Sequence, residues 1–112
     1  MASPEADSLL VGARELIAAS WTQHADARDA AGVAINPWEP DAVSWSLLGA
    51  LVNGYERLLW SEGQTAALTQ LAAACVLLAD LVDSHSLAAW NDAPARTQTD
   101  VLDLLDQALT RA

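Results

Sequence analysis

The sequence contains no lysine and no phenylalanine, and it has a single cysteine, Cys75. Five arginines stand against fifteen acidic residues, so the formal net charge is −10. A phosphate backbone or an acidic membrane surface repels such a chain, which argues against nucleic-acid binding and against membrane binding. A lone cysteine forms no internal disulfide, and this composition suits a reducing compartment.

Catalytic and cofactor motifs are also missing. The chain has no glycine-rich phosphate loop, no nucleophile elbow and no zinc-ligand spacing, so we predict no cofactor and no bound metal. The nearest metal candidate joins Asp80 and Asp83 to His85, but these positions do not share one helical face. The N-terminus is acidic, without a basic stretch followed by an apolar one, which predicts a cytoplasmic protein.

Hydrophobic residues make up 53% of the 112 residues, which is too many for a disordered chain. This length predicts a single helical domain over residues 1–112. The acidic residues are spread along the chain rather than clustered, and we interpret them as keeping an Ala- and Leu-rich domain in solution.

The apolar periodicity predicts an all-α fold, a compact bundle of four main helices. The predicted helices are residues 4–20, 41–60, 65–84 and 98–111. Ser3 and Asp41 are the predicted N-caps of the first two helices. Thr97 and Asp100 form a predicted capping box ahead of the last helix.

The segment Thr65–Val82 dominates this pattern, because fourteen of its eighteen residues are apolar. It is apolar nearly all round from Leu71 to Ala79, which predicts a central helix buried by neighbours on several sides. A transmembrane span is the competing interpretation. The polar residues Gln70 and Asp80 limit the uninterrupted run to nine residues, whereas a span needs roughly 20.

A long irregular connection is predicted between the first and second helices, over residues 22–40. Gly32 and two prolines interrupt any regular structure there. Residues 23–31 are predicted to form at most a weak helical turn or two, and residues 33–35 an apolar plug. No stretch alternates with a period of two, so no strand is predicted.

The second helix carries two glycines, Gly49 and Gly54, which leave one of its sides thin. A glycine inside a helix is typical of close approach by another element. We predict from this that the flank Gly49–Asn53–Gly54 packs on a second copy, giving a homodimer.

The chain has five tryptophans, an unusual number for its length: Trp21, Trp38, Trp45, Trp60 and Trp90. One interpretation is that they close the ends of the bundle. The other is that several of them line one pocket for an aromatic or flat ligand.

Asn91 and Asp92 form the densest polar cluster beside an apolar segment. In a structural role, Asp92 accepts backbone N–H groups at the start of the last helix or pairs with Arg96. In a functional role, the two residues bind or exchange protons at the mouth of a pocket. His24 and Glu39 are further acid–base candidates. The candidate binding residues are therefore Trp21, His24, Trp38, Glu39, Trp45, Trp90, Asn91 and Asp92.

Part of the chain, from Trp21 to Leu109, resembles a family of small proteins of unknown function from actinobacteria and their phages. The resemblance rests on Trp21, Gly32, Asp41-Ala42 after a proline, Trp45, Gly49-Ala50-Leu51, Asn91-Asp92, Thr97, Val101 and Leu105. The family pattern has a Trp-x-x-x-Gly-Ala-Leu segment and an Asn-Asp turn before a Thr-capped helix. It often has cysteine where this chain has Ser46, which argues against a thiol role there. The resemblance implies no activity.

These observations predict a small, non-enzymatic binding or interaction domain that acts through a Trp-lined pocket or groove. The pocket is expected where the long connection meets the Trp90–Thr97 turn, and its occupant is a small molecule or a protein partner. The first alternative is a small enzyme of specialised metabolism in which a carboxylate or histidine is the acid–base group. The second is an acidic phage or defence-related protein inhibitor.

Overall fold

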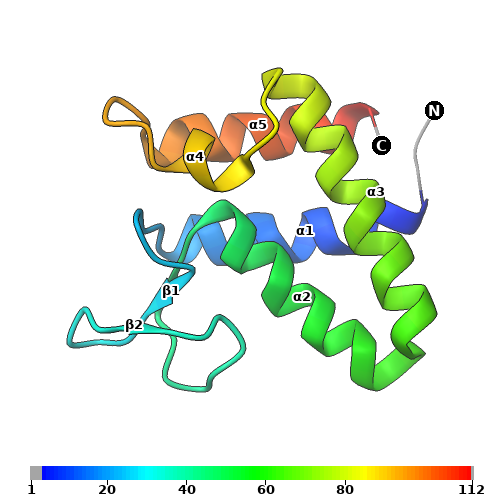
Figure 1. The fold of residues 1–112 in the computed structure, drawn as a ribbon, viewed down its shortest axis with the longest axis horizontal. Coiled ribbons are helices and arrows are strands. Elements are labelled where there is room, and N and C mark those ends of the chain that lie inside the picture. Colours follow the sequence, from blue (N-terminus) through cyan, green and yellow to red (C-terminus); the bar gives the residue numbers. More distant parts are fainter. Residues whose placement is uncertain (1–3, 112) are drawn as a thin grey trace.

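A computed structural model describes the backbone of residues 4–111 and the side chains of residues 7–111. Over this range the chain forms five helices and a small three-stranded sheet (Figure 1). In chain order these are α1 (Pro4–Ala19), β1 (Ala27–Arg28), β2 (Ala34–Ile35), β3 (Ser44–Trp45), α2 (Leu47–Glu62), α3 (Gln64–Val82), α4 (Leu87–Asn91) and α5 (Gln98–Arg111). The predicted compact helical fold is confirmed, but the sheet means that the chain is not purely α.

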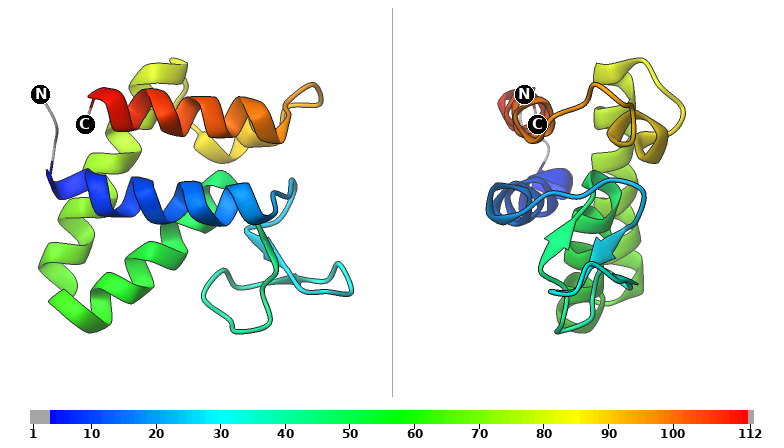
Figure 2. Two further views of the ribbon diagram at one scale, coloured as in Figure 1. Left: turned by 180° about the vertical axis from the view of Figure 1, so that it is seen from behind. Right: turned by 90° about the vertical axis from the view of Figure 1, so that its left-hand side faces the viewer.

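The core forms around α1, which packs against α2, α3 and α5. In both the front and the back view α1 runs between α5 and α2 (Figures 1 and 2). Leu10, Ala13 and Ile17 on α1 are completely buried. They repeat at three- and four-residue intervals and so lie on one helical face, which drives the packing by removing apolar surface from water.

The helix α3 is less buried than the sequence predicts. Its buried residues are Ala67, Ala74 and Leu78, whereas Leu68 and Val76 are 46% and 70% exposed. The prediction of a helix covered on several sides is therefore wrong, because the other helices pack against one face of α3 only. By length and composition alone, α3 is apolar enough to cross a membrane, with a mean hydropathy of 1.8.

The helix α2 begins six residues later than predicted, at Leu47 rather than residue 41. Ser46 is its N-cap, and the Ser46 hydroxyl accepts a hydrogen bond of 3.0 Å from the N–H of Gly49. The predicted N-cap Asp41 is wrong, since β3 lies between it and the helix. Pairing with another strand holds β3 extended and prevents the helix from starting earlier.

The connection between α1 and α2 folds into the sheet, with strand order β2-β1-β3 and antiparallel pairing. In the central strand, Ala27 lies opposite both Ile35 and Trp45. The weak helical turn predicted for residues 23–31 is therefore wrong. Each strand has two residues, which is too short for an alternating pattern to reveal it. The predicted apolar plug is also wrong, as Val33 is 57% exposed.

The capping box before α5 is confirmed. The Thr97 hydroxyl accepts a hydrogen bond from the Asp100 N–H at 3.1 Å, and the Asp100 carboxylate accepts one from the Thr97 N–H at 3.0 Å. Two N–H groups that the first turn of a helix leaves without partners are thereby satisfied. The predicted N-cap of α1, Ser3, lies outside the described residues.

An exposed ion pair between Arg14 and Asp106 connects α1 to α5. Hydrogen bonding to Arg14 holds the pKa of the Asp106 carboxyl below its ordinary value. The pair therefore stabilises the fold above the ordinary carboxyl pKa of about 4, and this contribution disappears as the pH falls through the lowered pKa. Since both groups are solvated, the contribution is small.

Other parts of the same chain fill the space beside the two glycines of α2. A Cβ on Gly49 would lie 1.8 Å from the carbonyl oxygen of Asp26, and one on Gly54 would lie 2.6 Å from Cδ2 of Leu9. The thin flank of α2 therefore lets the connection approach at Gly49 and α1 approach at Gly54. The prediction that this flank packs on a second copy is wrong.

We expect Gly49→Ala to destabilise the fold by about 2–3 kcal/mol, because the added methyl group overlaps backbone that cannot rotate away. Gly12→Ala is the matched control, since a Cβ at Gly12 has no atom within 4 Å and alanine favours the helix by up to about 1 kcal/mol. Urea unfolding measures both variants. Equal stability of the two variants would contradict the close approach at Gly49.

Candidate functional site

The side chain of Asn91, at the end of α4, is completely buried and uses all four of its hydrogen-bonding positions. Its Oδ1 accepts from the indole N–H of Trp21 at 2.7 Å and from the N–H of Leu47 at 3.0 Å. Its Nδ2 donates to the carbonyl oxygen of Thr22 at 3.1 Å and to Oδ1 of Asp92 at 3.0 Å. One amide thereby joins α4 to the start of the connection and to the start of α2.

Asp92 and His24 extend this arrangement to the surface. Oδ1 of Asp92 accepts the backbone N–H of His24 at 2.8 Å, and Oδ2 lies 3.8 Å from Nδ1 of the His24 ring. His24 has a φ of 65°, in the left-handed region that non-glycine residues enter rarely. The Asp92 carboxylate thus binds the residue that carries this backbone strain.

The same junction is reinforced by Gln23, whose Nε2 donates to the carbonyl oxygens of Asn91 and Ala93, both at 2.9 Å. We call Trp21, Gln23, His24, Asn91 and Asp92 the Asn91 cluster. The cluster brings together four of the eight residues that the sequence suggested as binding candidates.

Asp92 has partners other than those predicted. It bonds to His24 and Asn91 instead of capping the last helix. Arg96 pairs with Trp90: its guanidinium carbon lies 3.9 Å from the centre of the Trp90 ring, and its Nε donates to the Trp90 carbonyl oxygen at 2.8 Å. The two predicted structural partners of Asp92, the start of the last helix and Arg96, are therefore wrong.

Trp45 and Glu39 hold the connection in shape. The carbonyl oxygen of Pro37 accepts from the indole N–H of Trp45 at 3.2 Å and from Nδ2 of Asn53 at 2.9 Å. Oε2 of Glu39 accepts the N–H of Asn36 at 2.7 Å, which closes a turn. Both candidates thus have a structural contact in the loop.

His24 borders two hollows on the surface. A cavity of about 430 Å³ is lined by His24, Ala25, Asp26, Ala34, Ile35, Asn36 and Glu39. A second cavity, of about 320 Å³, is lined by His24, Ala25, Asp26, Ser46, Ala88 and Asp92. The acid–base candidates predicted from sequence therefore lie near one another, with His24 common to both hollows.

The five tryptophans do not converge on one pocket. Trp21 and Trp45 are neighbours through a backbone bridge, and Trp90 is covered by Arg96. Trp38 and Trp60 form a third group, since both line the same groove.

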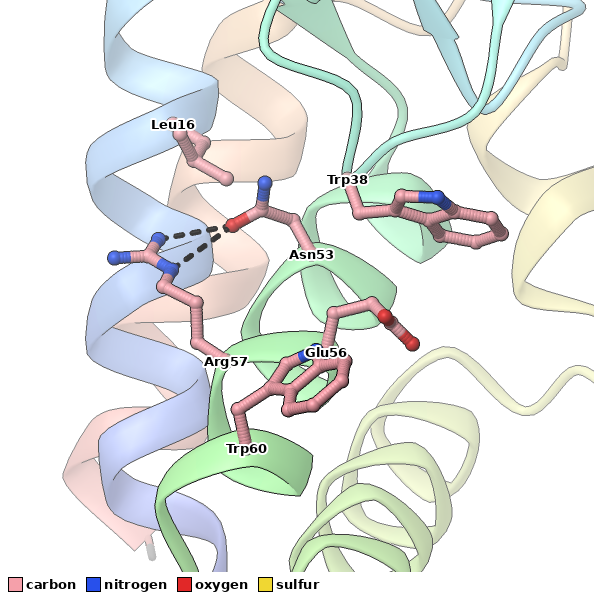
Figure 3. Close-up of a pocket in the computed structure, with 6 residues that line it drawn as sticks. All are labelled: Leu16, Trp38, Asn53, Glu56, Arg57 and Trp60. Carbon is pink, nitrogen blue, oxygen red and sulfur yellow. Dashed lines mark hydrogen bonds between the residues drawn. The ribbon is translucent and has the colours of Figure 1, made fainter.

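This groove has a volume of about 360 Å³ and is lined by Leu16, Trp38, Asn53, Glu56, Arg57 and Trp60 (Figure 3). We call it the Trp38–Trp60 groove. Trp38 is 48% exposed and Trp60 is 85% exposed. Trp60 was not among the predicted binding residues. The sequence does hold a signal for Trp60. It lies seven residues after Asn53 and four after Glu56, and positions at these spacings share one helical face.

Charges of opposite sign lie at the two sides of the groove. Nε and Nη2 of Arg57 donate to Oδ1 of Asn53 at 3.2 and 2.9 Å, and the guanidinium points to the side of Leu16 (Figure 3). The Glu56 side chain extends on the side of the two indoles (Figure 3). Within the described residues, the Glu56 carboxylate makes no hydrogen bond or ion pair through its side chain. This carboxylate is therefore available to a ligand.

Other reactive groups are dispersed or shielded. No three His, Cys, Asp or Glu side chains among the described residues are grouped so that they could hold a metal ion. Burial raises the pKa of the Cys75 thiol, which keeps it protonated and weakly nucleophilic at neutral pH.

The chain belongs to the family of unknown function DUF6197, whose family model matches residues 1–111. A search of curated proteins found no match to the chain, and a search of solved structures likewise found none.

We expect Asn91→Ala to destabilise the fold by about 3 kcal/mol, because it leaves the N–H groups of Trp21 and Leu47 buried without an acceptor. Asn36→Ala is the control, since Asn36 is exposed and should change stability by less than about 0.5 kcal/mol. Thermal unfolding with near-UV circular dichroism measures both effects. Similar melting of the two variants would argue against the central role of Asn91.

Proposed function

We propose that this DUF6197 protein is a small, non-enzymatic binding domain, and that the Trp38–Trp60 groove receives a flat, positively charged organic group of its ligand. The observation that supports this most directly is the pair of exposed indoles, Trp38 at 48% and Trp60 at 85% exposure, on one groove. Burying an indole removes a large apolar area from water. Two solvated indoles that line one groove therefore favour a ligand that covers them.

The charges around the groove support a cationic occupant. The Glu56 carboxylate lies beside the indoles and makes no bond through its side chain within the described residues. Indole rings attract cations through the negative face of the π-system. The net charge of −10 adds a long-range attraction for positive ligands. The one cation of the groove, Arg57, is held by Asn53 on the other side.

Several finer expectations stay predictions beside this proposal. They are the cytoplasmic location, the identity of the ligand as a small molecule or part of a protein, and the likeness to small actinobacterial and phage proteins. The groove differs from the pocket expected near Trp90, because Arg96 and the Asn91 cluster satisfy the polar groups there.

The test uses three ring compounds of similar size: benzyltrimethylammonium, benzyl alcohol and benzoate. We expect the indole N–H signals of Trp38 and Trp60 in ¹H–¹⁵N NMR spectra to shift with the cation most and with benzoate least. A cation–π contribution of about 0.5–1 kcal/mol makes the preference for the cation over the neutral ring roughly two- to five-fold. Trp60→Ala should abolish the response.

The role of charge has its own control. Glu56→Gln should remove the preference for the cation, whereas Glu15→Gln, an exposed substitution on α1 that changes the net charge equally, should retain it. Uniform shifts at all five indoles, or a preference for benzoate, would refute the proposal.

A second candidate function, a small enzyme, has one specific observation in its favour. The strained, exposed His24 has its Nδ1 3.8 Å from an oxygen of Asp92 and borders two hollows. A carboxylate beside one ring nitrogen orients an imidazole so that the other nitrogen can transfer protons. His24 would be the acid–base group, and Asp92 would position it.

The enzyme candidate predicts that some metabolite in a host extract disappears when the protein is added. His24→Gln should stop this turnover, and His85→Gln, which changes the other histidine of the chain, should not. Untargeted mass spectrometry of the extract measures the loss. Absence of any consumed metabolite, or equal turnover by His24→Gln, would leave the binding domain as the only supported function.

A further inference from the structure

The outer face of α3 is uncharged and largely apolar, with Thr65 and Thr69 as exposed polar residues. From Gln64 to Ala79 the helix has sixteen consecutive residues without a charge, in a chain whose net charge is −10. Leu68 and Val76 on this face are 46% and 70% exposed, and Ala72 is also exposed. The charge distribution therefore leaves one surface on which two acidic molecules can meet without charged side chains facing each other.

The residues of this face form a stripe that is symmetric about Ala72. Successive residues of an α-helix are about 100° apart, so positions separated by four or seven residues align. The residues Thr65, Leu68, Ala72, Val76 and Ala79 consequently lie on one side, opposite the buried residues of α3. Ala79 is half-buried, and the exposed Thr69 lies beside this row. Counting from Ala72, Leu68 mirrors Val76 at four residues, and Thr65 mirrors Ala79 at seven. We call these five residues the α3 stripe.

We propose that the α3 stripe is a homodimer interface on which α3 of a second copy packs antiparallel, with the two-fold axis at Ala72. In this register Leu68 contacts Val76 of the second copy, and Val76 contacts its Leu68. The small side chain at the axis allows the helices to approach closely. A two-fold interface requires a self-complementary surface, and the mirrored residues provide it.

Charge complementarity argues for the antiparallel direction. Asp80 and the C-cap Asp83 put negative charge at the C-terminal end of α3, where it opposes the helix dipole. At the other end, the N-cap Gly63 gives no side-chain cap, and the first turn contains no acidic residue. Asp80 and Gln64 are each eight residues from Ala72. An antiparallel pair therefore places Asp80 of each copy opposite the uncharged Gln64 of the other, with Glu62 two residues further on, whereas a parallel pair would place the two copies of Asp80 side by side.

A lipid bilayer is the other apolar environment that α3 suits by length and composition. However, α2 and α5 pack against α3 and carry exposed or partly exposed charged residues such as Arg57, Glu62 and Asp103. Inserting α3 would bring such groups into hydrocarbon, which is costly. A second copy covers the stripe without this cost.

The size of the stripe predicts a reversible dimer, because a single helix face lies at the small end of specific interfaces. Sedimentation velocity of the full chain from 1 to 500 µM should show a concentration-dependent shift from monomer to dimer. Val76→Asp should raise the dimer dissociation constant at least ten-fold, because it places two carboxylates in the interface. Val33→Asp is the matched control, at a valine exposed elsewhere, and it should leave the dissociation constant unchanged.

The register has a separate test. In a Cys75→Ala background, Ala72→Cys should form a disulfide-linked dimer under mild oxidation, because the axis brings the two copies of position 72 together. Val76→Cys in the same background should cross-link at least ten-fold more slowly, since each copy of position 76 faces position 68.

Three results would overturn the proposal. One is a monomer at every concentration, and another is a dimer that survives Val76→Asp or cross-links faster through position 76 than through position 72. The third is flotation of the wild-type protein with phosphatidylcholine vesicles that Val76→Asp abolishes, which would assign the stripe to a bilayer.

Discussion

The fold depends on one buried amide, that of Asn91. Its oxygen accepts the N–H of Leu47, the first residue of α2, and the indole N–H of Trp21. The first N–H groups of a helix have no partners within it, and a helix that starts in the interior must find them elsewhere. Asn91 fulfils this for Leu47, and Ser46 does so for Gly49. The start of α2 is therefore determined by a residue 44 positions further along the chain.

This arrangement divides the tryptophans into those that hold the fold together and those that are available to a ligand. The indole N–H groups of Trp21 and Trp45 are used inside the chain, by Asn91 and by the carbonyl oxygen of Pro37. Trp90 has Arg96 over its ring. Trp38 and Trp60 remain on the open groove. Because the connection is held at Pro37 by both Trp45 and Asn53, Trp38 next to it is presented over α2 on a fixed backbone.

The two surfaces that carry our proposals are physically different. The Trp38–Trp60 groove combines indoles with an available carboxylate, which suits a charged ligand in an otherwise acidic protein. The α3 stripe has no charge at all over its length, which suits an identical surface. They involve different helices, since the groove lies along α2 and the stripe on α3. Ligand binding and self-association are thus separable properties of one small fold.

By itself, the sequence determined the helices whose signals are local. α1 and α5 lie within one residue of their predicted bounds and α3 within two, because their apolar residues repeat over several turns. The capping box of Thr97 and Asp100 also marks where α5 begins.

Tertiary structure alone decided where α2 begins, why Gly49 is needed and which residues meet at the candidate sites. Strands of two residues carry no periodicity, and the bonds of Asn91 to Trp21 and Leu47 span 70 and 44 positions. Such contacts depend on the path of the whole chain, as does the pairing of Trp38 with Trp60 across the groove. The exposure of α3 has the same origin, because an apolar pattern indicates which residues favour burial but not whether enough neighbouring elements exist to cover them.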